Sequence, residues 1–129
     1  MSFYTYWGPK FPIFCVTGNS QSSKFYTGSA DGVYVWNTLD VEKVDIFSSN
    51  QDELPIIVNH FSHHNNEPIW DLKLHSMSPL LISAGADDSI CLCNTSDEKS
   101  KDNLLFRYIK IDDGVKETPT SIDWLPSSV

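Results

Sequence analysis

Short runs of alternating apolar and polar residues, separated by turn-forming residues, dominate the pattern of this chain. The runs are rich in β-branched and aromatic residues and have the length of β-strands. Gly, Pro, Asn, Asp and Ser occupy the intervals between them and predict turns. Because no stretch shows helical periodicity over a window of about 11 residues, the sequence predicts an all-β fold.

The pattern occurs twice. Residues 12–37 and residues 68–94 both open with Pro-Ile and an aromatic residue, and both end in Asn. The separation between Ile13 and Ile69 equals that between Asp31 and Asp87, so the two copies stay in step. A matched internal repeat predicts two copies of one structural unit.

Each copy predicts three strands and, after a loop, a fourth. The predicted strands are residues 13–17, 25–29, 33–37 and 55–61 in the first copy, and 69–74, 80–83, 90–94 and 104–109 in the second. We expect residues 3–6 and 120–125 to be strands of neighbouring units. Three polar stretches are predicted to be solvated loops: residues 38–54, 95–103 and 112–118.

Composition narrows the possible functions. The 129 residues include 17 acidic and 9 basic side chains, for a net charge of -8. An acidic chain repels phosphate, so we expect no binding to nucleic acid. There is no signal-peptide pattern and no apolar run of about 18 residues, so no membrane insertion is expected. The 3 cysteines include no C-x-x-C spacing, which favours a reducing, cytoplasmic location.

The turn between the second and third predicted strands carries the most specific motif. Thr-Gly-Ser-Ala-Asp-Gly at residues 27–32 is followed by a strand that ends in Trp36-Asn37. This arrangement resembles the WD-repeat signature. In WD blades, a Trp on the third strand bonds a Ser or Thr on the second, which bonds a His before the first strand, which bonds the Asp of the turn. Such a relay fixes the blade geometry because each buried polar atom gains a partner.

The resemblance implies a relay in each copy. Its residues would be Thr27, Asp31 and Trp36 in the first copy, and Ser83, Asp87 and either His63 or His64 in the second. The His position of the first copy falls at about Pro9, and Cys93 stands at the Trp position of the second. Both relays are therefore expected to be incomplete.

Motifs along the whole chain are similar to the C-terminal propeller of the striatin family. They are Pro-Ile-Phe-Cys-Val at residues 12–16, the turn motif at 27–32, Trp-Asn-Thr at 36–38, Pro-Ile-Trp-Asp-Leu at 68–72 and Pro-Thr-Ser-Ile-Asp at 119–123. The resemblance implies a partial WD-repeat β-propeller of about two and a half four-stranded blades. Blade one would span residues 12–61 and blade two residues 68–109.

The function that this resemblance implies is protein binding. Striatins are scaffolds that organise a type 2A protein phosphatase and kinases, and their calmodulin- and caveolin-binding segments lie before the propeller, so no such site is carried over. The alternative is a general WD adaptor, such as a ubiquitin-ligase substrate receptor or a transport-coat subunit. We expect partner contacts at Trp7, Lys10, Asn66 and Glu67. Trp70 and Trp124 are interpreted mainly as core or channel lining.

Two chemical alternatives compete with this interpretation. Ser83, a neighbouring His and Asp87 are the residue types of a hydrolase triad, but Ser83 falls inside a predicted strand and no Gly-x-Ser-x-Gly turn is present. Three histidines and two cysteines, His60, His63, His64, Cys91 and Cys93, are of zinc-binding type, but the cysteines lie on a strand instead of a turn. We therefore predict no enzyme, no metal and no cofactor.

A propeller closes with about four to eight blades. Two and a half blades leave strand edges unpaired, and unpaired edges favour association. We therefore expect the chain to be a fragment of a longer product, or to self-associate through its open strand edges.

Overall fold

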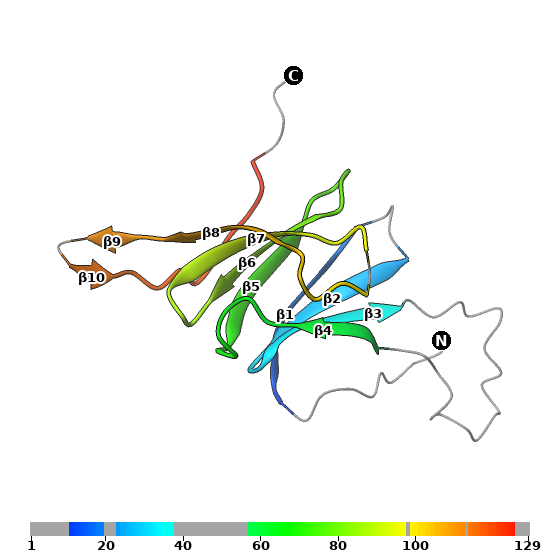
Figure 1. Ribbon diagram of the computed structural model, residues 1–129, viewed down its shortest axis with the longest axis horizontal. Coiled ribbons are helices and arrows are strands. Elements are labelled where there is room, and N and C mark those ends of the chain that lie inside the picture. Colours follow the sequence, from blue (N-terminus) through cyan, green and yellow to red (C-terminus); the bar gives the residue numbers. More distant parts are fainter. Residues whose placement is uncertain (1–10, 20–22, 38–56, 98, 113, 126–129) are drawn as a thin grey trace, which may run out of the picture.

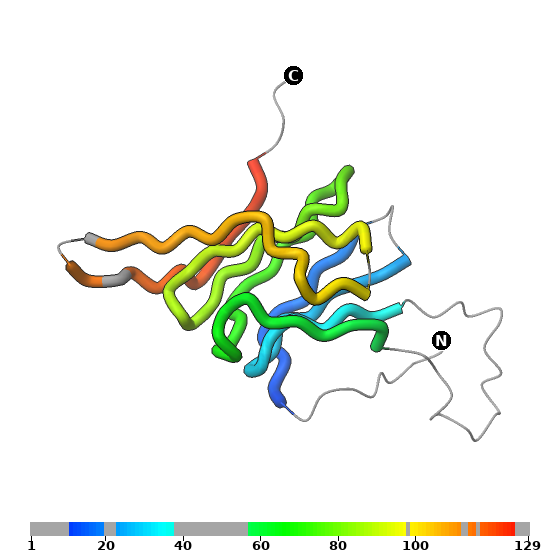
Figure 2. Tube along the Cα trace, viewed as in Figure 1, coloured from blue at the N-terminus to red at the C-terminus, as the bar shows by residue number. Residues whose placement is uncertain are grey.

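The computed structural model describes residues 11–19, 23–37, 57–97, 99–112 and 114–125, which contain ten strands and no helix (Figures 1 and 2). The predicted all-β fold is therefore confirmed. Several predicted features lie outside these ranges: Trp7, Lys10, Pro9, the strand at residues 3–6 and the loop at residues 38–54.

The first copy of the repeat forms one antiparallel sheet of four strands in chain order. Its strands are β1 (Ile13–Gly18), β2 (Lys24–Ser29), β3 (Gly32–Asn37) and β4 (Ile57–Phe61). A tight turn joins β2 to β3, so that Ser29 pairs with Gly32. Gly32 has a φ of 127°, and a Cβ there would lie 2.7 Å from the carbonyl oxygen of Phe61, so this turn requires glycine.

The second copy forms an equivalent sheet in the same strand order. Its strands are β5 (Ile69–Leu74), β6 (Leu80–Gly85), β7 (Ser89–Asn94) and β8 (Leu104–Ile109). The turn from β6 to β7 includes Asp88, which adopts a left-handed φ of 67°. The strand ends differ from the prediction by one or two residues, because residues such as Gly18 and Gly85 continue the backbone pairing without giving an apolar signal.

The two sheets pack against each other, with β1 beside β5 (Figure 1). The apolar side chains between them are buried: Tyr26, Val33, Val35 and Phe61 from the first sheet, and Ile69, Leu72, Leu74, Leu81 and Cys93 from the second. Removing this surface from water is the main favourable contribution to the packing. Two polar side chains also bridge the sheets. Thr17 Oγ1 accepts a hydrogen bond from the Leu74 N–H at 3.0 Å, and Asn19 donates to the His75 carbonyl at 2.8 Å.

The segment after β8 differs from the prediction. The stretch predicted as a loop holds a short hairpin, β9 (Ile111–Asp112) and β10 (Val115–Lys116), which projects away from the sheets in Figure 1. Residues 120–125, expected to be a strand, form none. A strand forms only where a neighbouring backbone can pair with it. None of the described residues pairs its backbone with residues 120–125.

Residues 120–125 instead lie beside β5, where one backbone N–H and two side chains contact this strand. The Ile122 N–H donates to Asp71 Oδ2 at 3.0 Å, and the Ser121 hydroxyl lies 3.5 Å from the same oxygen. Trp124 Nε1 donates to the Lys73 carbonyl at 3.0 Å. These contacts hold the tail beside β5.

Candidate functional site

One histidine of the loop between β4 and β5, His64, points into the interior of the second sheet. His64 is fully buried, with Nδ1 2.7 Å from Asp87 Oδ1 and Nε2 2.8 Å from Ser83 Oγ. Ser83 lies on β6, and Asp87 lies in the turn that follows this strand. The structure thus brings together three of the residues that the sequence selected.

His63 lies apart from these three residues. Its Nε2 is 2.5 Å from Asn103 Oδ1, and its ring packs against Phe61. The sequence left His63 and His64 as alternatives, and the geometry places His64 between Ser83 and Asp87.

Electrostatics define the protonation of the buried histidine. Burial lowers the pKa of His64, and this outweighs the opposite effect of Asp87. Burial alone would raise the pKa of Asp87, but hydrogen bonds from His64 and Ser89, together with Arg107 at 2.5 Å from Oδ2, hold it below its usual value. The imidazole is therefore neutral and donates from Nδ1 to a charged carboxylate. Its Nε2 then accepts a hydrogen bond from the Ser83 hydroxyl.

The chain of hydrogen bonds in the second sheet stops at Ser83. Cys93, at the position where WD blades carry Trp, has its Sγ 3.6 Å from the Leu81 carbonyl oxygen and bonds to that group. A thiol is too short to span the distance that an indole spans. The second sheet therefore contains the His–Ser–Asp part of a relay without its Trp.

The first sheet contains the complementary part. Trp36 Nε1 donates to Thr27 Oγ1 at 2.8 Å, and both residues are buried. Asp31 accepts from Ser29 Oγ at 2.7 Å and from the Tyr34 hydroxyl at 2.6 Å. The turn aspartate of the first sheet, Asp31, therefore bonds residues close to it in the sequence, whereas the turn aspartate of the second sheet, Asp87, bonds the buried His64.

These contacts determine the ionisation of Asp31, in the turn between β2 and β3. Burial alone would raise the pKa of Asp31, but the bonds from Tyr34 and Ser29 and the nearby His60 ring lower it overall. Burial, reinforced by the carboxylate, raises the pKa of Tyr34 to about 12. The His60 ring stacks on Tyr34 with centroids 4.1 Å apart. Asp31 is thus a stable anion in the turn between β2 and β3.

Ser83, His64 and Asp87 have the hydrogen-bond connectivity of a catalytic triad, but their surroundings differ from those of an active site. A nucleophilic serine must reach a substrate and face an oxyanion-binding group on an exposed turn. Ser83 is buried in the middle of β6, where its backbone pairs with Leu72 on one side and Cys91 on the other. The arrangement satisfies buried polar atoms and stabilises the sheet.

The cysteines near this cluster are protonated thiols. Burial raises the pKa of Cys91 and raises that of Cys93 to about 12. Cys91 Sγ lies 4.0 Å from His64 Nδ1 and 3.6 Å from the His63 carbonyl oxygen. Within the described ranges, no three His, Cys, Asp or Glu side chains are grouped so as to hold a metal ion.

Above the buried histidine, the loop presents polar side chains to solvent. Asn65 and Asn66 have left-handed φ values of 54° and 60°, and the Asn66 N–H donates to Ser62 Oγ at 3.0 Å. The Glu67 N–H donates to the His64 carbonyl at 2.9 Å. Because His64 is fixed below, Asn66 and Glu67 are held outward on a defined loop.

An exposed aromatic pair lies beside this loop. Trp70 and Phe14 are both exposed, and their rings contact each other with centroids 5.4 Å apart. Each follows Pro-Ile at the start of its copy, so the repeat brings them to the same end of the two sheets. Phe14 is not among the residues predicted from the sequence, although its equivalence to Trp70 in the repeat is a usable signal. We call Phe14, Asn66, Glu67 and Trp70 the turn-end surface.

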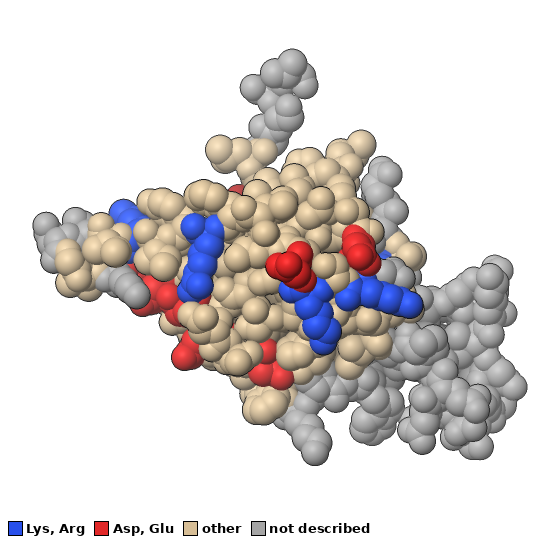
Figure 3. Space-filling view, viewed as in Figure 1, with Lys and Arg blue, Asp and Glu red and all other residues tan. Residues whose placement is uncertain are grey.

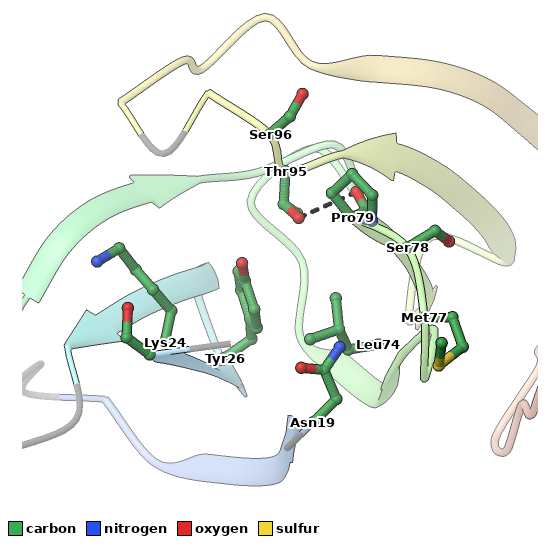
Figure 4. Close-up of a pocket in the computed structure, with 10 residues that line it drawn as sticks. Asn19, Lys24, Tyr26, Leu74, Met77, Ser78, Pro79, Thr95 and Ser96 are labelled. Carbon is green, nitrogen blue, oxygen red and sulfur yellow. Dashed lines mark hydrogen bonds between the residues drawn. The ribbon is translucent and has the colours of Figure 1, made fainter. Parts of the chain in front are cut away.

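A cavity of about 400 Å³ lies at the opposite end of the sheets (Figure 4). Tyr26, Leu74 and Pro79 line it, and the Thr95 hydroxyl at its rim donates to the Pro79 carbonyl at 3.0 Å. On the face shown in Figure 3, basic and acidic side chains are interspersed and form no continuous basic patch. No helix among the described residues is long and apolar enough to cross a membrane.

Comparisons with known proteins agree with the motif analysis. Residues 56–94 match the family model "WD domain, G-beta repeat". Over 97 residues, 73% of this chain, the sequence is 27% identical to human Striatin. The chain spans 12% of the length of that relative. The chain therefore contains a segment that matches a WD repeat, in a region that is similar to Striatin.

Proposed function

We propose that this chain is the binding part of a protein scaffold and that it contacts its partners through the turn-end surface. The observation that carries the proposal is the exposed Phe14–Trp70 pair next to the loop that bears Asn66 and Glu67. Large aromatic side chains often dominate binding energy when they lie at the centre of an interface. Surface loops that a rigid scaffold positions commonly carry function.

The hydrogen bonds below this surface support the same role. His64 bonds Asp87 and Ser83 with its two ring nitrogens, and its carbonyl accepts from the Glu67 N–H. Because hydrogen bonds fix both the His64 side chain and the loop backbone, the loop loses little conformational freedom when a partner binds. This favours affinity. The buried cluster thus supports partner binding through the conformation of the loop.

The similarity to Striatin supports a narrower assignment. We propose that the partners belong to an assembly of a type 2A protein phosphatase with kinases, as the resemblance to striatins implies. Trp7 and Lys10, which precede Phe14 in the sequence, are proposed to extend the turn-end surface. Under this proposal, the chain contributes binding and positioning and no catalysis.

The test is a binding titration. The purified 129-residue chain is immobilised, and a purified type 2A phosphatase heterodimer is titrated over it. We expect Trp70→Ala and Glu67→Ala each to weaken binding by about tenfold, which corresponds to about 1.4 kcal/mol. Met77→Ala, which changes an exposed side chain at the opposite end of the sheets, serves as the matched control.

Two outcomes contradict the proposal. Equal affinity of the wild-type chain, Trp70→Ala and Glu67→Ala contradicts the proposed surface. Failure of the wild-type chain to bind the phosphatase contradicts the assignment to this assembly.

A further inference from the structure

The outer edge of the second sheet continues beyond the sheet itself. β8 ends at Ile109 and β9 begins at Ile111, so residues 104–112 form one nearly continuous extended run (Figure 1). β7 pairs with the first part of this run and β10 with the last part, and both lie on the same side of it in Figure 1. The other side pairs with none of the residues that the structure describes, and we call it the open edge.

The hydrogen bonds of the hairpin identify the backbone groups that point to the open edge. The Glu117 N–H donates to the Lys110 carbonyl at 3.2 Å, so the backbone polar groups of Lys110 point toward β10. Along an antiparallel strand, these groups point alternately to one side and to the other. The N–H and carbonyl groups of Arg107, Ile109 and Ile111 therefore point outward, to the open edge.

The corresponding edge of the first sheet is capped by a side chain. By register, His60 on β4 corresponds to Arg107 on β8. The His60 N–H donates to Asn59 Oδ1 at 2.9 Å, so a backbone donor that a further strand could use already has a partner. The residue before Arg107 is Phe106, whose side chain has no oxygen to accept such a bond. The edge of β8 therefore lacks the cap that β4 has.

The open edge also has few of the features that commonly protect an edge strand. Proline, free lysine side chains and bulges discourage further pairing. Residues 104–112 contain no proline, and their one bulge lies near the start of β8. Arg107 Nη2 lies 2.5 Å from Asp87 Oδ2. Lys110 Nζ lies 3.1 Å from Glu117 Oε2. Because carboxylates of the same sheet and hairpin neutralise both cations, they oppose a further strand only weakly.

We propose that the open edges of two copies of this chain pair antiparallel about a two-fold axis, with Ile109 of one copy opposite Ile109 of the other. In this register Arg107 lies opposite Ile111 of the other copy, so that outward N–H groups face outward carbonyls. Tyr108 lies opposite Lys110 of the other copy, where an ammonium group and an aromatic ring attract each other. Neither pair opposes like charges. Because both copies use the same surface, the contact forms a closed dimer.

The surroundings of the open edge fit a second copy. The net charge of -8 makes two copies repel each other, so contact is favoured where the local charges are neutralised, as they are for Arg107 and Lys110. Ile111 is 59% exposed, and the pairing covers part of this apolar surface. Residues 120–125 lie beside β5, at the opposite edge of the sheet, and leave the open edge uncovered. The contact assigns a particular strand to the edge association expected from the sequence.

Sedimentation velocity of the 129-residue chain over a broad range of concentrations tests the contact. We expect the wild-type chain to show a monomer–dimer equilibrium. Ile109→Pro removes an outward N–H, so it should raise the dissociation constant of the dimer by about tenfold or more. Ile109→Val keeps that N–H and is the matched control, which should dimerise as the wild-type chain does. A wild-type chain that stays monomeric at every concentration overturns the proposal, and so does unchanged dimerisation of Ile109→Pro.

Cross-linking tests the register of the two strands. Ile109→Cys places a thiol opposite the same thiol of the other copy, so mild oxidation should give covalent dimers on a non-reducing gel. Met77→Cys, at a position that is 74% exposed at the other end of the sheets, is the matched control and should stay monomeric on the gel. Equal yields of covalent dimer from the two variants overturn the proposal. If Ile109→Pro loses its cooperative unfolding transition, Ile111→Pro replaces it, because β9 lies outside the four-stranded sheet.

Discussion

Trp36 and Cys93 occupy the same register position in the two sheets, opposite Phe25 and Leu81 respectively. Trp36 reaches across its sheet to the Thr27 hydroxyl, whereas the Cys93 thiol bonds the carbonyl of Leu81. The indole of Trp36 is long enough to link β3 to β2 through a side-chain hydrogen bond, whereas the shorter thiol of Cys93 is not. Each sheet keeps a different part of the same relay, and each part satisfies its own buried polar atoms.

The bond between Trp36 and Thr27 can be removed without changing the size of the side chain. Thr27→Val leaves the buried indole N–H without its acceptor, so we expect the free energy of unfolding to fall by about 1–3 kcal/mol. Urea unfolding followed by tryptophan fluorescence measures the change. Thr120→Val, at an exposed position, is the control and should leave stability nearly unchanged. Equal stability of both variants would show that the bond contributes nothing.

The contact between the sheets has little space at Gly28. A Cβ at this position would lie 2.5 Å from Cys15 Sγ on the neighbouring strand and 2.7 Å from Ile69 Cγ2 of the second sheet. We expect Gly28→Ala to lower the free energy of unfolding by about 1–3 kcal/mol, because the sheets must separate to accept it. Gly18→Ala is the matched control, since its Cβ would meet nothing closer than 3.5 Å. Similar thermal midpoints for the two variants would contradict the observed packing.

The buried histidine predicts a specific pH dependence. The pKa of His64 is lowered in the folded chain, so the unfolded chain binds a proton on acidification before the folded chain does. The contribution of neutral His64 to the free energy of unfolding is complete above the ordinary histidine pKa of about 6.5, and it is lost as pH falls below that value. Urea unfolding between about pH 8 and pH 5 should show this loss of stability.

His64→Gln removes the group responsible, so its unfolding free energy should depend less on pH over the same interval. His75→Gln, outside the buried cluster, controls for the loss of a histidine and should keep the wild-type dependence. Identical pH profiles for the wild-type chain and His64→Gln would mean that His64 does not ionise differently on folding.

Thiol labelling tests the burial of the cysteines. Burial raises the pKa of Cys15 to about 11 and that of Cys93 to about 12, so neither forms much thiolate near neutral pH. We expect iodoacetamide at pH 8 to modify the native chain far more slowly than the chain in denaturant. Intact mass measured over time follows the reaction. Rapid modification of Cys93 in the native chain would contradict the packing between the sheets.

Much of this architecture could be predicted from the sequence because the same pattern of residues occurs in both copies of the repeat. The alternating runs predicted β5 and β8 with their observed bounds, and the Ala-Asp turns predicted both central hairpins. The choice between His63 and His64 was not predictable, because adjacent loop residues point in directions that depend on the local φ values. The tail at residues 120–125 has the pattern of a strand but forms no backbone pairing with the residues that the structure describes, and a sequence pattern alone does not predict whether a pairing partner is present.

The central claim is that His64, Ser83 and Asp87 stabilise a WD blade instead of catalysing a reaction. Ser83→Ala is the most direct test when unfolding in urea and hydrolysis of a chromogenic ester are measured on the same preparations. We predict a loss of about 1–3 kcal/mol in unfolding free energy, because His64 Nε2 loses its buried donor, and no hydrolysis by either protein. Ester hydrolysis by the wild-type chain that disappears in Ser83→Ala, with stability unchanged, would contradict the claim.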